Sequence, residues 1–172
     1  MSPSTPFSIS NFNLWTGIDW LQSACLGLIL LDIETISSIR EDLLTPREAA
    51  RVMRMGTRRR RDFIAARVAL KRLARQLNLV KEDRPDGEIE TLGPDGVRPR
   101  FAESEIHCSV SHSGRLVVAV AHKHPVGVDI EMVSEKATRI WSHFLSPVES
   151  HLVSQPGLST ERAAARAWTA KE

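Results

Sequence analysis

The chain has 172 residues, of which 42% are hydrophobic and 26% are charged, a balance that is typical of a folded globular protein and excludes a largely disordered one. Lys and Arg number 23 against 21 Asp and Glu, so the net charge of +2 does not indicate a general nucleic-acid binder. No basic region precedes the first apolar run, and the longest such run, residues 25–31, is too short to span a bilayer. We therefore expect no membrane partner and a cytoplasmic location.

Two consecutive helices are predicted in the first half of the chain. Thr45 can cap a helix, Pro46 suits the first helical position, and Glu48 can close a capping box. Gly56 is expected to interrupt this helix, and a second one is expected over residues 58–79.

Apolar positions along the second helix recur every three or four residues, which predicts one buried face. These positions are Phe63, Ala66, Leu70, Leu73 and Leu77. Arg60, Arg67 and Lys71 lie on one line beside that face. A guanidinium at Arg67, so close to the core, needs either a protein acid or a ligand phosphate as its partner. Nucleic-acid binding by the arginines at 58–61 is another functional interpretation, but neither interleaved aromatic residues nor a known nucleic-acid-binding fold accompanies them.

The rest of the chain contains short apolar or alternating runs bounded by turn residues. They predict strands over residues 25–33, 88–92, 106–110, 116–121 and 126–131. A final helix is expected over residues 160–172, with Trp168 packing inward and carrying Glu172 on the same face. Cys25 and Cys108 lie in apolar stretches, and we expect both to be reduced core thiols.

Two acids at the end of the last predicted strand form the most informative local pattern. Because side chains alternate along a strand, Gly127, Asp129 and Glu131 share one face. The two carboxylates can converge on one hard cation, and Mg²⁺ favours one or two carboxylates together with substrate phosphates. An ordinary solvated strand face with two acids is the structural alternative.

Ser111 and His112 lie where a predicted strand turns, and such groups can donate hydrogen bonds to phosphate oxygens. A Ser-His-Asp hydrolase using Asp129 is a competing interpretation. It is disfavoured because no Gly-x-Ser-x-Gly elbow is present and because neighbouring strand residues face opposite ways. A plain polar turn is the structural alternative.

Taken together, these motifs resemble the Sfp-type 4'-phosphopantetheinyl transferase family. The matching segments are Gly127-Val128-Asp129-Ile130-Glu131, Trp168-Thr169-Ala170-Lys171-Glu172, Ser111-His112-Ser113, Arg98-Pro99, Ala66-Arg67-Val68-Ala69-Leu70 and Phe144-Leu145-Ser146-Pro147-Val148-Glu149. Asp129 and Trp168 are 39 positions apart, which matches the family's spacing. The family continues beyond the final motif, so the resemblance implies that the second half is truncated here.

The resemblance implies an α+β fold of two pseudo-symmetric α/β halves. Residues 1–123 would form the N-terminal half, with the CoA-binding helix and the Ser-His-Ser turn. Residues 124–172 would form an incomplete C-terminal half that carries the metal-binding acids.

The resemblance also implies an enzyme that transfers 4'-phosphopantetheine from coenzyme A to a serine of an acyl- or peptidyl-carrier protein, releasing adenosine 3',5'-bisphosphate. Such enzymes serve polyketide, non-ribosomal peptide or fatty acid biosynthesis. The implied metal ligands for Mg²⁺, or alternatively Mn²⁺, are Asp129, Glu131 and Glu172. The implied CoA-binding residues are Arg67, Arg98, Ser111 and His112. The implied catalytic residues are Glu149, Lys171 and Glu172, and either glutamate or a metal-bound water could take the serine proton. A non-catalytic homologue that binds CoA or a carrier protein in a regulatory role is the alternative.

Overall fold

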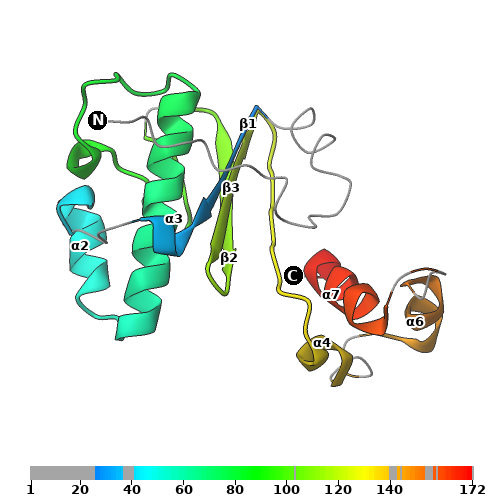
Figure 1. Cartoon of the computed structure of the whole chain (residues 1–172). Helices are drawn as coiled ribbons and strands as arrows, with labels where there is room; N and C mark the ends of the chain where they lie inside the picture. The colour runs from blue at the N-terminus through cyan, green and yellow to red at the C-terminus, as the bar shows by residue number, and fades with distance from the viewer. Residues whose placement is uncertain are drawn as a thin grey trace.

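The computed structural model describes residues 26–36, 41–102, 104–139, 143, 145–153, 157 and 159–171. Its centre is a three-stranded antiparallel sheet with the order β1-β3-β2, as Figure 1 shows. The strands are β1 (Gly27–Asp32), β2 (His107–Ser113) and β3 (Leu116–His122). Three predicted strands are thus confirmed to within a few residues, and the predicted α+β class is confirmed. Cys25 and the N-terminal arm lie outside the described residues.

Helices α2 (Pro46–Val52) and α3 (Thr57–Gln76) follow β1, and α3 packs against one face of the sheet (Figure 1). The predicted capping box is confirmed, because the Thr45 side chain accepts from the Glu48 amide while Glu48 accepts from the Thr45 amide. The predicted interruption is also confirmed, since Gly56 is the N-cap of α3. The helix ends at Gln76, three residues earlier than predicted, and Asn78 then takes a left-handed φ of 55°.

The core lies between α3 and the sheet. It contains Ile64, Val68 and Leu73 from the helix and Val117, Ala119 and Ala121 from β3. Because side chains alternate along a strand, Val118 and Val120 point to the opposite face of the sheet. In the described part of the chain, the connections contain the short 3-10 helices η2 (Ile33–Thr35), η3 (Glu41–Leu43) and η4 (Asp86–Glu88).

The predicted strand over residues 88–92 is wrong. Its first residue belongs to η4, and the only pairing nearby is an isolated bridge between Leu92 and Pro99. Two amides of this segment donate to carboxylates instead: Thr91 N to Glu48 Oε1 at 3.1 Å and Leu92 N to Glu90 Oε1 at 2.9 Å. Since these amides are already satisfied by side chains, they are not available to a neighbouring strand.

The predicted strand over residues 126–131 is also wrong, although the segment lies along the sheet. Figure 1 shows it on the side opposite α3. Its amides at Val128, Ile130 and Met132 donate to serine hydroxyls of β2 and not to backbone carbonyls. We call residues 126–132 the extended segment.

Among the described residues, three helices follow the extended segment: α4 (Glu135–Arg139), α6 (Pro147–Val153) and α7 (Thr160–Lys171). They gather on the far side of the extended segment from α3 (Figure 1). Helix α7 begins where predicted and buries an alanine-rich face: Ala163, Ala164, Ala165 and Ala167. Glu172 and Phe144 lie outside the described residues, and the two pseudo-symmetric halves stay a prediction. None of the helices in the described part of the chain is long and apolar enough to cross a bilayer.

Candidate functional site

A row of serine hydroxyls on β2 holds the extended segment against the sheet. Ser109, Ser111 and Ser113, which we call the serine ladder, point to the face opposite α3 because they alternate with residues that contact the core. Their hydroxyls accept from the amides of Val128 at 3.2 Å, Ile130 at 3.3 Å and Met132 at 3.2 Å. Each contact joins residues 19 positions apart, so the segment runs parallel to β2.

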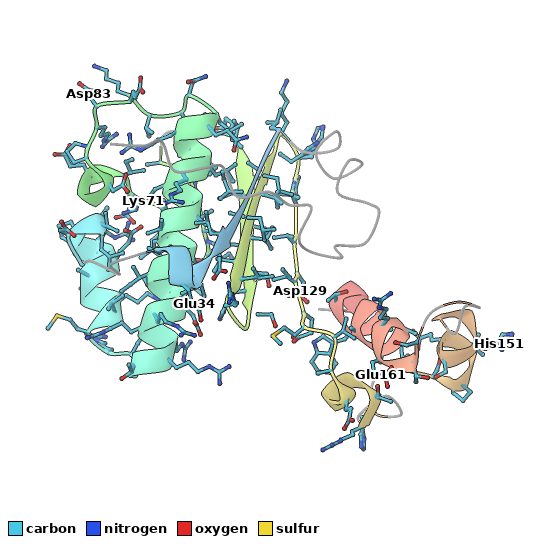
Figure 2. The ribbon with its side chains drawn as sticks, viewed as in Figure 1. Glu34, Lys71, Asp83, Asp129, His151 and Glu161 are labelled. Atoms are coloured by element: carbon cyan, nitrogen blue, oxygen red, sulfur yellow. The ribbon has the colours of Figure 1, made fainter. Side chains whose placement is uncertain are left out.

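Two rungs of the serine ladder also hold the predicted metal-binding acids. The Ser111 hydroxyl donates to Asp129 Oδ1 at 2.6 Å, and the Ser113 hydroxyl donates to Glu131 Oε1 at 2.9 Å. Both acids are exposed, whereas Val128 and Ile130, which alternate with them along the segment, are half-buried. Figure 2 places Asp129 on the side of the sheet away from α3. The predicted alternation of faces is therefore confirmed, even though the segment is not a strand.

The acids face open space. A Cβ atom built on Gly127 would meet no atom within 4 Å, so this glycine is not required for packing in the described part of the chain. Paired carboxylates beside open space fit a hard cation that keeps substrate phosphates or waters as its other ligands. Within the part of the chain that the structure describes, no group of three or more His, Cys, Asp or Glu residues could hold a metal ion. The third predicted ligand, Glu172, lies outside that part.

His112 points the opposite way from its neighbouring serines. Its Nε2 lies 3.5 Å from Asp62 Oδ2 of α3, and its side chain is 48% exposed. Ser111 bonds directly to Asp129 with no histidine between them. The arrangement therefore rules out the competing Ser-His-Asp hydrolase interpretation for these three residues, as alternation along the strand had indicated.

Arg67 is buried, with only 4% of its surface exposed. Its Nη1 donates to the Thr91 carbonyl at 2.9 Å, and its guanidinium lies 4.9 Å from the centre of the Phe63 ring. Burial lowers the pKa of Arg67, partly offset by Glu48. Among the described residues, the partners of this guanidinium are the carbonyl and hydroxyl of Thr91 and an aromatic face, with no direct hydrogen bond to a protein acid, and the predicted contact with a ligand phosphate stays a prediction.

A basic pocket, none of whose lining residues the sequence analysis assigned to a site, lies between α2 and the turn at residues 93–98. Its volume is about 450 Å³, and four arginines line it: Arg47, Arg51, Arg54 and Arg59. Arg47 donates to the Gly93 carbonyl at 3.1 Å, and Arg51 donates to the Gly96 carbonyl. The spacing of four between residues 47 and 51 was the available signal, because it places two cations on one face of α2. We call this cavity the arginine pocket.

Arg98 lies on the same turn, with 88% of its side chain exposed and its Nε 3.8 Å from Asp95 Oδ2. The amides of Val97 and Arg98 donate to Asp95 and lower the pKa of that carboxyl. A groove of about 660 Å³ extends from Arg98 to His107 and Ser109 on β2. This groove connects the turn with the first rung of the serine ladder.

The remaining predicted catalytic residues lie in the last two helices. Glu149 is part of a second capping box, since its Oε2 accepts from the Ser146 amide at 2.8 Å while its own amide donates to the Ser146 hydroxyl at 3.3 Å. Lys171 is the last residue of α7. Trp168 is half-buried rather than fully packed inward.

Comparison with known proteins places this geometry in a family context. Residues 125–172 match the family model of the 4'-phosphopantetheinyl transferase superfamily. The predicted resemblance to this superfamily is thereby confirmed. Enterobactin synthase component D from an Escherichia coli strain and from Shigella flexneri is 26% identical over 147 residues, covering 84% of this chain and 67% of each relative. The 4'-phosphopantetheinyl transferase gsp of Aneurinibacillus migulanus is 37% identical over 73 residues, covering 42% of this chain and 31% of that protein.

The superfamily match includes the extended segment with Asp129 and Glu131 and all of α7. The serine ladder and the arginine pocket precede the matched residues. Membership of the Sfp-type subgroup stays a prediction.

Proposed function

We propose that the protein transfers 4'-phosphopantetheine from coenzyme A to a serine hydroxyl of an acyl- or peptidyl-carrier protein. The observation that carries this proposal is the pair of exposed carboxylates, Asp129 and Glu131, held on one face inside the segment that matches the superfamily. In the transfer, the serine oxygen forms a bond to the β-phosphorus of CoA. The bridging P–O bond breaks, and adenosine 3',5'-bisphosphate leaves.

Asp129 and Glu131 would hold Mg²⁺ or Mn²⁺ together with Glu172. A divalent cation at this position supplies charge neutralisation for the diphosphate as its bridging bond breaks. Two carboxylates suit this task because they leave ligand positions for diphosphate oxygens.

The arginine pocket is the part of the molecule best suited to CoA phosphates. Its guanidiniums can make bidentate charge-assisted hydrogen bonds to phosphate oxygens. Arg98 and His112 keep their predicted roles as further phosphate donors, since both side chains are accessible. For the buried Arg67 we propose a supporting role: it fixes Thr91, which precedes the pocket residue Leu92.

The serine proton needs an acceptor near the metal. Glu149 already accepts a backbone amide as a helix cap, so moving it toward substrate would uncap α6. Glu172, or a water held beside the two acids, would therefore take the proton in preference to Glu149, and Lys171 is the sequence neighbour of Glu172.

Mass spectrometry of an apo carrier protein, incubated with CoA, Mg²⁺ and the full-length protein, tests the proposal. A phosphopantetheine mass should appear on the carrier, and EDTA or Asp129→Ala should prevent it. Glu135→Ala is the matched control, because this acid is also exposed but pairs with Arg139. CoA binding without any transfer to several carrier proteins would instead support the non-catalytic alternative and refute the enzymatic function.

A further inference from the structure

The serine ladder does more than attach the extended segment to the sheet. Ser111 accepts from the Ile130 amide and donates to Asp129, while Ser113 accepts from the Met132 amide and donates to Glu131. A hydroxyl has a single proton to donate. Each serine therefore directs its one donor at one carboxylate oxygen and uses a lone pair for the following amide.

We infer that Ser111 and Ser113 are positioning residues that orient Asp129 and Glu131 for metal binding. This inference rests on the proposed function, because it assumes that the two acids bind a divalent cation. It gives Ser111 a different role from the CoA contact that the sequence predicted.

The physical reason is preorganisation. Asp129 and Glu131 are exposed. Among the described residues, the hydrogen bonds that restrict their rotamers come from the two serine hydroxyls and from the Met132 amide, which also donates to Glu131 Oε1. Fixing one oxygen of each carboxylate removes rotamer freedom before the cation arrives, and it aims the group. Loss of a hydrogen bond to a ligating carboxylate typically weakens metal affinity about 10- to 100-fold.

The serines could instead serve only to attach the extended segment to the sheet. Ser109 is a control for this competing role. Ser109 accepts from the Val128 amide just as the other two serines accept from theirs. The residue at the position equivalent to Asp129 and Glu131 is Gly127, which has no carboxylate to orient. Ser109→Ala therefore removes one attachment without removing a carboxylate contact.

The test measures Mn²⁺ affinity by electron paramagnetic resonance of the free ion, with and without CoA, using the full-length protein. Ser111→Ala and Ser113→Ala should each weaken Mn²⁺ binding about 10- to 100-fold, while Ser109→Ala should change it less than about threefold. Ser111→Thr and Ser113→Thr keep the hydroxyl on a strand that tolerates threonine, so they should retain most of the affinity. Melting temperatures of all five variants show whether each is folded.

Equal losses of affinity in all three alanine variants would overturn the inference, because they would indicate attachment alone. Unchanged affinity in Ser111→Ala and Ser113→Ala would overturn it, and so would losses in the threonine variants as large as in the alanine variants. Absence of Mn²⁺ binding in the unmodified protein would also overturn it. The carrier-protein assay on the same preparations reports the proposed function separately. If Mn²⁺ affinity depends on Ser111 and Ser113 but the protein transfers nothing to carrier proteins, the proposed enzymatic function is refuted and the positioning role is retained.

Discussion

Replacing Lys71 should destabilise the protein strongly, because Lys71 and Glu48 form an ion pair with no solvent exposure. Lys71 Nζ lies 2.7 Å from Glu48 Oε2, and both side chains are 0% exposed. Lys71 also donates to the carbonyls of Leu43 and Asp86, as its place between α3 and the neighbouring loops in Figure 2 allows. The pair joins α2, α3 and the connections around η3 and η4.

The expected loss of unfolding free energy follows from the contacts that remain after Lys71→Met. The Glu48 carboxylate would stay buried with only uncharged donors from Thr45 and Thr91, and two carbonyls would lose a donor. Breaking a buried ion pair by removing one partner costs about 3–5 kcal/mol. Since whole domains have unfolding free energies of about 5–15 kcal/mol, this single change should remove a large part of the stability.

Urea unfolding followed by circular dichroism measures the effect. The double variant Glu48→Gln/Lys71→Met should be more stable than the sum of the two single losses predicts, by about 0.5–3 kcal/mol of coupling. Arg139→Ala is the matched control: Arg139 is 2.8 Å from Glu135, but the two side chains are 76% and 75% exposed. It should leave the unfolding free energy unchanged within error. A loss below about 1 kcal/mol for Lys71→Met, or strict additivity in the double variant, would refute the reasoning.

Four further predictions concern the candidate site and the thiol beside it. Asp129→Ala should abolish metal-dependent transfer with an unchanged melting temperature, because the carboxylate is exposed; substantial remaining turnover would exclude it as a ligand. Gly127→Ala should also fold normally, since its Cβ meets no atom within 4 Å, yet transfer should fall if substrate occupies that space. Arg51→Ala should weaken CoA binding in titration calorimetry about ten- to a hundredfold, and undiminished affinity would move the phosphates elsewhere. Burial raises the pKa of Cys108 to about 11. At pH 8 about a thousandth of this thiol is ionised, so in a Cys25→Ser background iodoacetamide labelling should be slow and should rise about tenfold per pH unit; fast labelling at pH 8 would contradict this.

The starts of α2, α3 and α7 and three strands were predictable because their signals are local. Thr45 and Glu48 form a capping box through atoms three residues apart, and Gly56 interrupts the helix where it stands. Because sequence signals are local, they could not predict the long-range contacts of Glu48. Its second role, as the buried partner of Lys71 and Thr91, depends on residues 23 and 43 positions away that no short pattern links to it.

The errors at the candidate site have a similar origin. Alternation assigned Asp129 and Glu131 to one face of the segment. It cannot say whether a backbone carbonyl or a side chain of the neighbouring strand accepts the hydrogen bonds from the segment's amides. Arg67 was expected to need a partner, and the backbone carbonyl of Thr91 is one. Every residue has such a carbonyl, so the sequence could not indicate this contact. The arginine pocket depends on α2 lying against the turn at 93–98, which is a tertiary contact.

The three residues Ser111-His112-Ser113 connect both sides of the sheet because they lie on one strand. The two serines face the extended segment and bond to Asp129 and Glu131, whereas His112 faces α3 and Asp62. If the extended segment were a paired strand, backbone hydrogen bonds would place its acids whatever residues β2 carried. Because hydroxyls hold it instead, the side chains of β2 set the positions of both carboxylates. The geometry of the proposed metal site should therefore be sensitive to single-atom changes in the Ser-His-Ser motif that leave the sheet intact.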